Sequence, residues 1–182
     1  MTTININTKS QLAKLIATEN ITVEHNAVPT ASFDTLNRIL TLPIFKEKSG
    51  DVYDMLIAHE CAHALYTPGN GWKEIMNDDE LRSYCNVLED TRIDKLIQKK
   101  YPGVKRNYLN GWDILNKQNF FGIKGKDLNT ELMLIDKINL RSKSSNRLKF
   151  KLSKEEDKWL DVVDSIKSWK DVVKVAKQML DW

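Results

Sequence analysis

Hydrophobic residues recur every three or four positions along most of the chain, and they alternate with polar residues only near the N-terminus. The first spacing is the period of an amphipathic helix, and the second is the period of a strand. The helical pattern predicts helices over residues 8–18, 51–66, 78–100, 108–118, 129–140, 154–166 and 169–181. The alternating pattern predicts a strand over residues 21–25 and a β-hairpin made of residues 29–33 and 38–42. We therefore expect an α+β fold that is mostly helical, with a small N-terminal sheet and a C-terminal helical extension.

The segment 51–66 is predicted to be a buried helix. Cap-type residues precede it at Ser49 and Gly50, and Pro68 with Gly69 stops it. Apolar residues occur on both sides of its helical wheel, which is typical of a helix enclosed by the protein. Polar side chains within such a helix need partners, because burying an unpaired polar group is costly.

Capping boxes mark the start of several later helices. In this pattern a Ser, Thr, Asp or Asn caps the helix, and an acidic residue follows three positions later. Such boxes occur at residues 77–80, 153–156 and 168–171. The first opens a long helix that ends before Pro102 and Gly103. We interpret the two C-terminal helices as packing elements that steady the rest of the domain, with a partner surface as their alternative role.

Length and composition are those of a single globular domain. The 182 residues are 41% hydrophobic and 29% charged, which is ordinary for a soluble protein. We expect a core over about residues 20–125 and a helical C-terminal subdomain over about residues 126–182. The net charge of +3 is too small to indicate nucleic-acid binding. The basic segment 141–151 has no aromatic ladder beside it, so it is interpreted as a solvated loop.

The sequence favours a cytoplasmic location. No apolar run reaches the roughly 18 residues of a membrane span. Residues 1–10 have neither the apolar core nor the cleavage-like site of a secretory signal. The two cysteines, Cys61 and Cys85, both fall on predicted helices, and we interpret them as reduced thiols of that compartment.

The chemistry of the chain centres on the motif His59-Glu60-x-x-His63. Two histidines four positions apart on a helix lie on one face, one turn from each other, and can bind one zinc ion. Glu60 lies about 100° round the helix from His59, where its carboxylate can reach a metal-activated water without ligating the metal. This division of roles is what metal-assisted hydrolysis requires. The alternative is a coincidental spacing, and the third histidine, His25, is expected on the surface or in a loop.

The helix 78–100 offers the third ligand that a catalytic zinc ion usually has. On its helical wheel Glu89 lies on the apolar face, whereas Asp90 lies about 100° away on the polar side. A carboxylate that faces a core needs a compensating charge, which zinc would supply. Glu89 is therefore the expected ligand. A Glu89–Arg92 ion pair on a solvated face is the alternative, and the thiolate of Cys85 is a rival ligand.

Two segments of the chain resemble known metallopeptidases. The His59-Glu60-x-x-His63 motif followed by a helical glutamate is similar to the zincins with a glutamate third ligand, the gluzincins. The run Asn86-Val-Leu-Glu-Asp-Thr-Arg-Ile-Asp94, followed by Tyr101-Pro-Gly103, resembles a peptidase-like domain with the run Asn-x-x-Glu-Asp-x-Arg-Ile-Glu. That domain precedes von Willebrand factor A modules in proteins related to the cobaltochelatase T subunit. The resemblance covers about residues 28–105.

The chain departs from the family pattern after the acidic pair. Asp94 stands where the family run commonly has glutamate. Many gluzincins also have an aspartate four residues after the glutamate ligand, where it orients a zinc-binding histidine. Here Ile93 occupies that position, while Asp94 lies four residues after Asp90. Asp90 therefore stays open beside Glu89 as the third ligand.

The resemblance implies a zinc-dependent metallopeptidase that acts on a peptide or protein substrate. His59, His63 and Glu89 would bind Zn²⁺, and Glu60 would act as the general base toward the metal-activated water. Further residues are candidates for supporting the metal ligands or stabilising the transition state. They are Asp90, Arg92, Tyr101 and Tyr108.

The competing function is a non-catalytic, zinc-containing binding or assembly module with a zincin fold. The resemblance also implies a partner, either a MoxR-type AAA+ ATPase or a von Willebrand A protein. A small sheet just before the metal helix offers an edge strand to which an extended peptide could add. The alternative for this hairpin is that it only covers the core.

Overall fold

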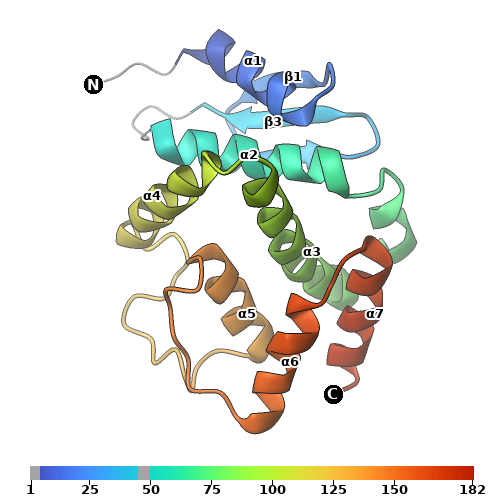
Figure 1. Ribbon diagram of the computed structural model, residues 1–182, viewed down its shortest axis with the longest axis vertical. Coiled ribbons are helices and arrows are strands. Elements are labelled where there is room, and N and C mark those ends of the chain that lie inside the picture. Colours follow the sequence, from blue (N-terminus) through green and yellow to red (C-terminus); the bar gives the residue numbers. More distant parts are fainter. Residues whose placement is uncertain (1–4, 45–49) are drawn as a thin grey trace.

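The fold was analysed in a computed structural model that describes residues 5–44 and 50–182. Within these residues the chain forms seven α-helices, a short 3₁₀ helix and three β-strands. In chain order they are α1 (Ile6–Ala17), β1 (Thr22–Asn26), β2 (Ser32–Asp34), β3 (Ile39–Pro43), α2 (Gly50–Tyr66), η1 (Gly71–Ile75), α3 (Asp79–Lys100), α4 (Val104–Lys117), α5 (Leu134–Lys143), α6 (Lys154–Asp164) and α7 (Trp169–Leu180). The predicted α+β class, mostly helical with a small N-terminal sheet, is confirmed (Figure 1).

Helix α1 begins at Ile6 rather than at residue 8, and α4 begins at Val104 rather than at residue 108. Two further helices differ from the prediction for local reasons. The cap of α3 is Asp78 rather than Asn77, because a side-chain oxygen of Asp78 accepts a hydrogen bond from the backbone N–H of Leu81 at 2.9 Å. Helix α5 begins and ends later than predicted, so residues 141–143 form its last turn instead of lying in a solvated loop. The capping boxes that open α6 and α7 are confirmed. The expected cap at Ser49 lies outside the described residues.

The three strands form one sheet in the order β1-β3-β2. Strands β2 and β3 are antiparallel, as the predicted hairpin requires, with Ser32 opposite Thr41 and Asp34 opposite Ile39. The carboxylate of Asp34 tightens their turn by accepting hydrogen bonds from the backbone N–H groups of Leu36 and Asn37. Strand β1 runs parallel to β3 on its other side. Among the described strands, β2 therefore lies at an edge of the sheet.

Two clusters of buried apolar side chains share helix α3. The first lies among α1, the sheet and α2, and takes in Ile93 and Ile97 from the C-terminal half of α3. The second joins Leu81, Cys85 and Leu88 from its N-terminal half to α5, α6 and α7. Figure 1 shows α3 running between α2 and α7. The middle of α3 is therefore where the two clusters meet.

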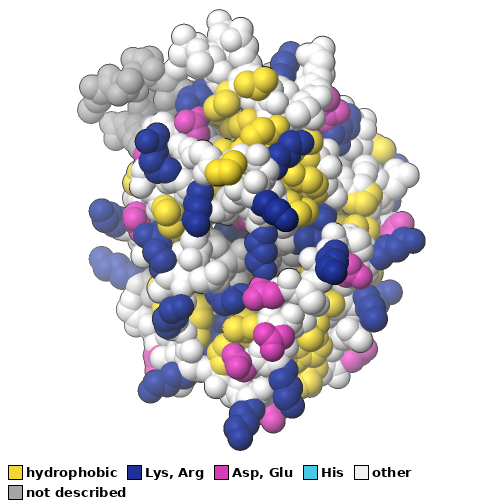
Figure 2. Space-filling view, viewed as in Figure 1, with side chains coloured by type: hydrophobic (Ala, Val, Ile, Leu, Met, Phe, Trp, Pro, Cys, Tyr) yellow, Lys and Arg dark blue, Asp and Glu magenta, His cyan; other side chains and the backbone are white. Residues whose placement is uncertain are grey.

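Charged side chains of both signs are mixed on one face of the molecule. On the face drawn in Figure 2, Lys and Arg side chains are scattered over the molecule and interleaved with acidic ones. No helix in the described ranges is long and apolar enough to cross a membrane.

A glycine substitution tests the contact between η1 and α7. A Cβ atom at Gly71 would lie 2.8 Å from Cε2 of the buried Trp169 indole, a rigid group that cannot swing away. We expect Gly71→Ala to lower the free energy of unfolding by about 1–3 kcal/mol, the usual cost of overpacking. The measurement is chemical denaturation of the purified protein.

The matched control is Gly103→Ala. Gly103 is exposed, and a Cβ atom there would meet nothing within 4 Å. We expect it to change the free energy of unfolding by less than about 0.5 kcal/mol. Equal destabilisation by the two substitutions would show that the packing of Trp169 against Gly71 is not what limits stability.

Candidate metal centre

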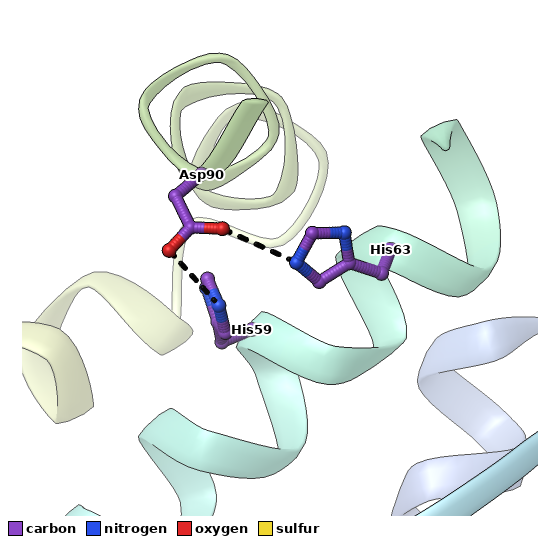
Figure 3. A group of neighbouring side chains, drawn as sticks. All are labelled: His59, His63 and Asp90. Carbon is purple, nitrogen blue, oxygen red and sulfur yellow. Dashed lines mark ion pairs between the residues drawn. The ribbon is translucent and has the colours of Figure 1, made fainter. Parts of the chain in front are cut away.

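Helices α2 and α3 bring two histidines and one aspartate together. His59, His63 and Asp90 each offer one ligand atom, and these atoms all lie within 4.8 Å of one another. Figure 3 shows both imidazoles projecting from α2 toward the carboxylate on α3. Nε2 of His63 is 3.2 Å from Oδ1 of Asp90, and Nε2 of His59 is 3.6 Å from Oδ2. Two imidazoles and a carboxylate are a donor set that suits divalent transition metals.

The position of α2 explains why both histidines face α3. Its opposite side is held in the first apolar cluster, where Ile57, Ala58 and Cys61 are fully buried. The Cys61 thiol also donates a hydrogen bond to the backbone carbonyl of Ala13 in α1 at 3.3 Å. Burial raises the pKa of this thiol to about 12, so it is an inert part of the packing. The histidine face is left to meet α3.

Neighbouring side chains hold His59 with Nε2 toward Asp90. Its Nδ1 lies 2.8 Å from Oδ1 of Asp94, and the hydroxyl of Tyr108 donates to the same oxygen at 2.7 Å. Because the carboxylate can only accept, Nδ1 carries a proton, and Nε2 is the nitrogen that would ligate a metal ion in place of its own proton. A metal-binding histidine commonly has such a carboxylate partner. Asp94 is thus placed as the family pattern would require if Asp90, four residues earlier, were the ligand.

A second chain of hydrogen bonds orients His63. Its Nδ1 lies 3.0 Å from the hydroxyl oxygen of Thr67, and that hydroxyl donates to Oε1 of Glu89 at 2.5 Å. Since the Thr67 proton goes to Glu89, its oxygen accepts from Nδ1–H of His63. Nε2 of His63 is again the nitrogen that would ligate a metal ion, and it faces Asp90.

The structure groups Asp90, not Glu89, with the histidines. The fully buried carboxylate of Glu89 is held by Arg92 through two hydrogen bonds, Nε to Oε2 at 2.8 Å and Nη2 to Oε1 at 2.7 Å. The predicted Glu89–Arg92 pair therefore forms, but inside the protein rather than on a solvated face. Through Thr67 the role of Glu89 is to orient His63. The rival ligand Cys85 lies in the second apolar cluster, outside the metal group.

The polar side of α3, on which Asp90 was predicted to lie, is covered by the protein rather than open to solvent. Asp90 is only 8% exposed, because α5 packs against α3 and brings Lys143 over it. Nζ of Lys143 is 3.0 Å from Oδ2 of Asp90 and 3.3 Å from Oδ2 of Asp94. The sequence analysis missed Lys143, since nothing distinguishes it from the other basic residues of the segment 141–151.

The charges in this group shift one another's pKa values. Burial and Lys143 lower the pKa of His59, but Asp94 and Asp90 outweigh them and raise it to about 9. Burial raises the pKa of Asp90, yet Lys143 and His59 outweigh it and hold that pKa well below the usual range. Asp94 behaves in the same way, with a pKa of about 2. Both carboxylates are therefore ionised near neutral pH and present negative charge to a cation.

One buried oxygen indicates that the group fits a cation. Among the described residues, Oδ1 of Asp90 is a buried side-chain oxygen without a hydrogen-bond partner, which is costly unless a positive charge approaches it. Nε2 of His63 faces this oxygen, and Nε2 of His59 faces the other oxygen of the same carboxylate. His59, His63 and Asp90 can therefore hold a metal ion.

The metal group forms part of the wall of a cavity of about 440 Å³. Glu60, which is 6% exposed, lines the cavity beside the histidines, and burial raises the pKa of its carboxyl. Residues 29–33, which lead into and include part of β2, form another wall. Trp112 and Phe121, stacked with their ring centroids 4.3 Å apart, form an aromatic wall. The volume of the cavity is in the range of ligand-binding pockets.

The other candidate residues have separate places. Tyr108 lines the cavity. Tyr101 does not, and its hydroxyl donates to the backbone carbonyl of Ile16 at 3.2 Å. Arg92 is occupied by Glu89. His25 lies in β1, partly buried, where its ring bridges the hydroxyls of Ser10 and Tyr53 at 3.0 and 2.9 Å.

Comparison of the chain with models of known protein families, with curated proteins and with solved structures gave no match. The resemblance to gluzincins therefore rests on the motif residues themselves.

Isosteric substitutions separate the roles of the two neighbouring acids. Asp90→Asn should weaken zinc binding by more than about 100-fold, because it removes the charged ligand oxygen. Glu89→Gln should change zinc affinity by less than about tenfold, since its amide oxygen can still accept from Thr67. The affinities are measured by competition with a chromogenic chelator.

Without metal, Glu89→Gln should lower the free energy of unfolding more than Asp90→Asn does. Glu89→Gln leaves Arg92 buried without its counter-charge, and we expect a loss of about 3–5 kcal/mol in the free energy of unfolding. If Glu89→Gln abolished zinc binding in a folded protein while Asp90→Asn retained it, the assignment of Asp90 would be wrong.

Proposed function

We propose that this protein is a zinc-dependent metallopeptidase, with His59, His63 and Asp90 as metal ligands and Glu60 as general base. The observation that carries the proposal is the placement of Glu60. A buried carboxyl with a raised pKa lines the same cavity as the three ligands, and it belongs to the residue directly after the first histidine. A base beside a metal group in a cavity is the combination that metal-assisted hydrolysis needs.

The residues of the chain divide the chemistry among them. A bound zinc ion would act as a Lewis acid, lowering the pKa of a coordinated water and polarising the carbonyl of the substrate. Glu60 accepts a proton from the attacking water and later gives it to the leaving amine. Asp94 and Thr67 keep the two histidines in the tautomer that ligation requires. Of Arg92, Tyr101 and Tyr108, the candidates for stabilising the transition state, only Tyr108 lines the cavity.

The shape of the cavity supports a peptide as the substrate. Residues 29–33 bring the edge of the sheet to the cavity, and an edge strand can pair with an extended peptide through its backbone groups. The aromatic wall formed by Trp112 and Phe121 offers apolar surface to a side chain of that peptide. These two features together fit an extended chain better than a small polar molecule.

The number of ligands favours catalysis over a purely structural zinc site. A structural zinc ion normally has four protein ligands, whereas a catalytic one has three and an open position. Within the described residues the metal group comprises three side chains, and it borders a cavity. If a test of turnover detected no peptide cleavage, the non-catalytic binding module would be the better description. A MoxR-type AAA+ ATPase or von Willebrand A partner stays a prediction from the resemblance.

The proposal predicts the metal content. The purified protein should contain about one zinc ion per chain, because the site has one set of ligands. His59→Ala and His63→Ala should each abolish tight binding. Elemental analysis after dialysis measures the content. Stoichiometric zinc in the double variant would place the metal elsewhere and contradict the site.

Glu60→Gln tests turnover. The amide keeps the size of the side chain but cannot accept the proton, so cleavage of an unfolded protein substrate should fall by about 10²–10⁴-fold. Zinc content and melting temperature should stay close to those of the unmodified protein. Glu74→Gln, at an exposed position of η1, is the matched control and should retain activity.

Two outcomes would overturn parts of this proposal. If the zinc-loaded protein cleaves no unfolded substrate, the binding module becomes the better description. If Glu60→Gln strips the zinc, Glu60 is a ligand rather than a base.

A further inference from the structure

Lys143 is the part of the metal site that comes from the C-terminal helices. Its ammonium group contacts Oδ2 of Asp90 at 3.0 Å and Oδ2 of Asp94 at 3.3 Å. The side chain is 22% exposed and lines the cavity. It reaches the site from the last turn of α5, more than fifty residues after the motif helix.

Helix α5 holds Lys143 firmly in this place. Its apolar face, including Ile135 and Ile138, lies in the second cluster. On the same helix Lys137 forms a largely buried ion pair with Glu156 of α6 at 3.0 Å. The packing of α5 therefore places Lys143 beside the two aspartates.

The contacts assign each carboxylate oxygen of the site a distinct role. Oδ1 of Asp94 receives Nδ1–H of His59 and the hydroxyl of Tyr108, and its Oδ2 faces Lys143. Oδ2 of Asp90 faces Lys143 at 3.0 Å and, at the longer distance of 3.6 Å, Nε2 of His59. Oδ1 of Asp90 is the oxygen without a hydrogen bond, and it faces Nε2 of His63.

We propose that Lys143 is a positioning residue of the metal site, which binds Oδ2 of Asp90 and so restricts ligation to Oδ1. A carboxylate can bind a metal through one oxygen or through both. With Oδ2 engaged by an ammonium group, Asp90 is a one-oxygen ligand, and the remaining coordination position stays available. This inference rests on the proposed metal site and adds a residue that lies outside both sequence motifs.

The charge of Lys143 has a second effect at the same site. Asp90 and Asp94 both lie beside the metal group, and together they would neutralise a divalent cation. The ammonium group makes the site one unit more positive, which favours the Lewis-acid character that hydrolysis uses. Both of its contacts are with carboxylates of the protein, so Lys143 orients ligands rather than binding substrate.

Cobalt substitution tests the ligation of Asp90 without measuring activity. Cobalt(II) accepts the same ligands as zinc, and its visible absorption is strong when it is four-coordinate and weak at higher coordination numbers. The unmodified protein loaded with cobalt should have strong bands. In Lys143→Met the second oxygen of Asp90 is free to chelate, so the bands should weaken several-fold. Lys143→Arg should restore them, because it can still bind Oδ2.

Lys99→Met is the control, since Lys99 is an exposed lysine at the end of α3. It should leave the spectrum unchanged. A wild-type spectrum in folded Lys143→Met would overturn the role of Lys143 while leaving the metal site intact. Failure of the unmodified protein to bind cobalt or zinc would instead overturn the metal site, and with it the proposed function.

A measurement on the unmodified protein keeps the inference falsifiable if Lys143→Met does not fold. X-ray absorption of the zinc-loaded protein counts the nitrogen and oxygen atoms at about 2.0–2.2 Å from the metal. We expect four, with one from Asp90. A first shell of five or more that includes both oxygens of a carboxylate would show that Lys143 does not restrict Asp90.

Discussion

The structure depends on compensating the charge of acidic side chains that are buried where α2 meets α3. These are Glu60, Glu89, Asp90 and Asp94, each less than a tenth exposed. An ionised carboxylate away from water is stable only beside an opposite charge or strong donors. Arg92 supplies the charge for Glu89, and Lys143 supplies it for the two aspartates. The same ion pairs therefore allow α3 to pack between the two apolar clusters and set the arrangement of the candidate site.

The neighbouring acids of α3, Glu89 and Asp90, have different partners. Glu89 and Asp90 point about 100° apart on the helix, so one faces Arg92 and the other faces the histidines. Glu89 still contributes to the site, because Thr67 connects its carboxylate to the imidazole of His63. A buried ion pair is weak evidence for added stability. Here its geometric effect is clearer, since it fixes a hydroxyl that in turn fixes a ligand.

Local sequence signals predicted the helices, the hairpin and the motif helix well. Capping boxes and helical spacing depend on residues three or four apart, and such contacts hold in any surrounding. The helical wheel favoured Glu89 over Asp90 because it cannot show what packs on each side: the polar side of α3 that carries Asp90 is covered by α5. Lys143 could not have been found, because its role depends on a contact between segments about fifty residues apart. The spacing of Asp94 four residues after Asp90 was the one usable signal that Asp90 lies with the histidines.

The origin of Lys143 in the last third of the chain has a consequence for biosynthesis. Translation proceeds from the N-terminus, and a domain begins to fold as its segments emerge. Both sequence motifs, with the three residues of the candidate metal group, leave the ribosome before α5 does. Until α5 docks, Asp90 and Asp94 face each other and the histidines with no ammonium group between them. At that stage the two aspartates of the nascent chain have no lysine to neutralise them. A divalent cation bound there would supply the positive charge that Lys143 later provides.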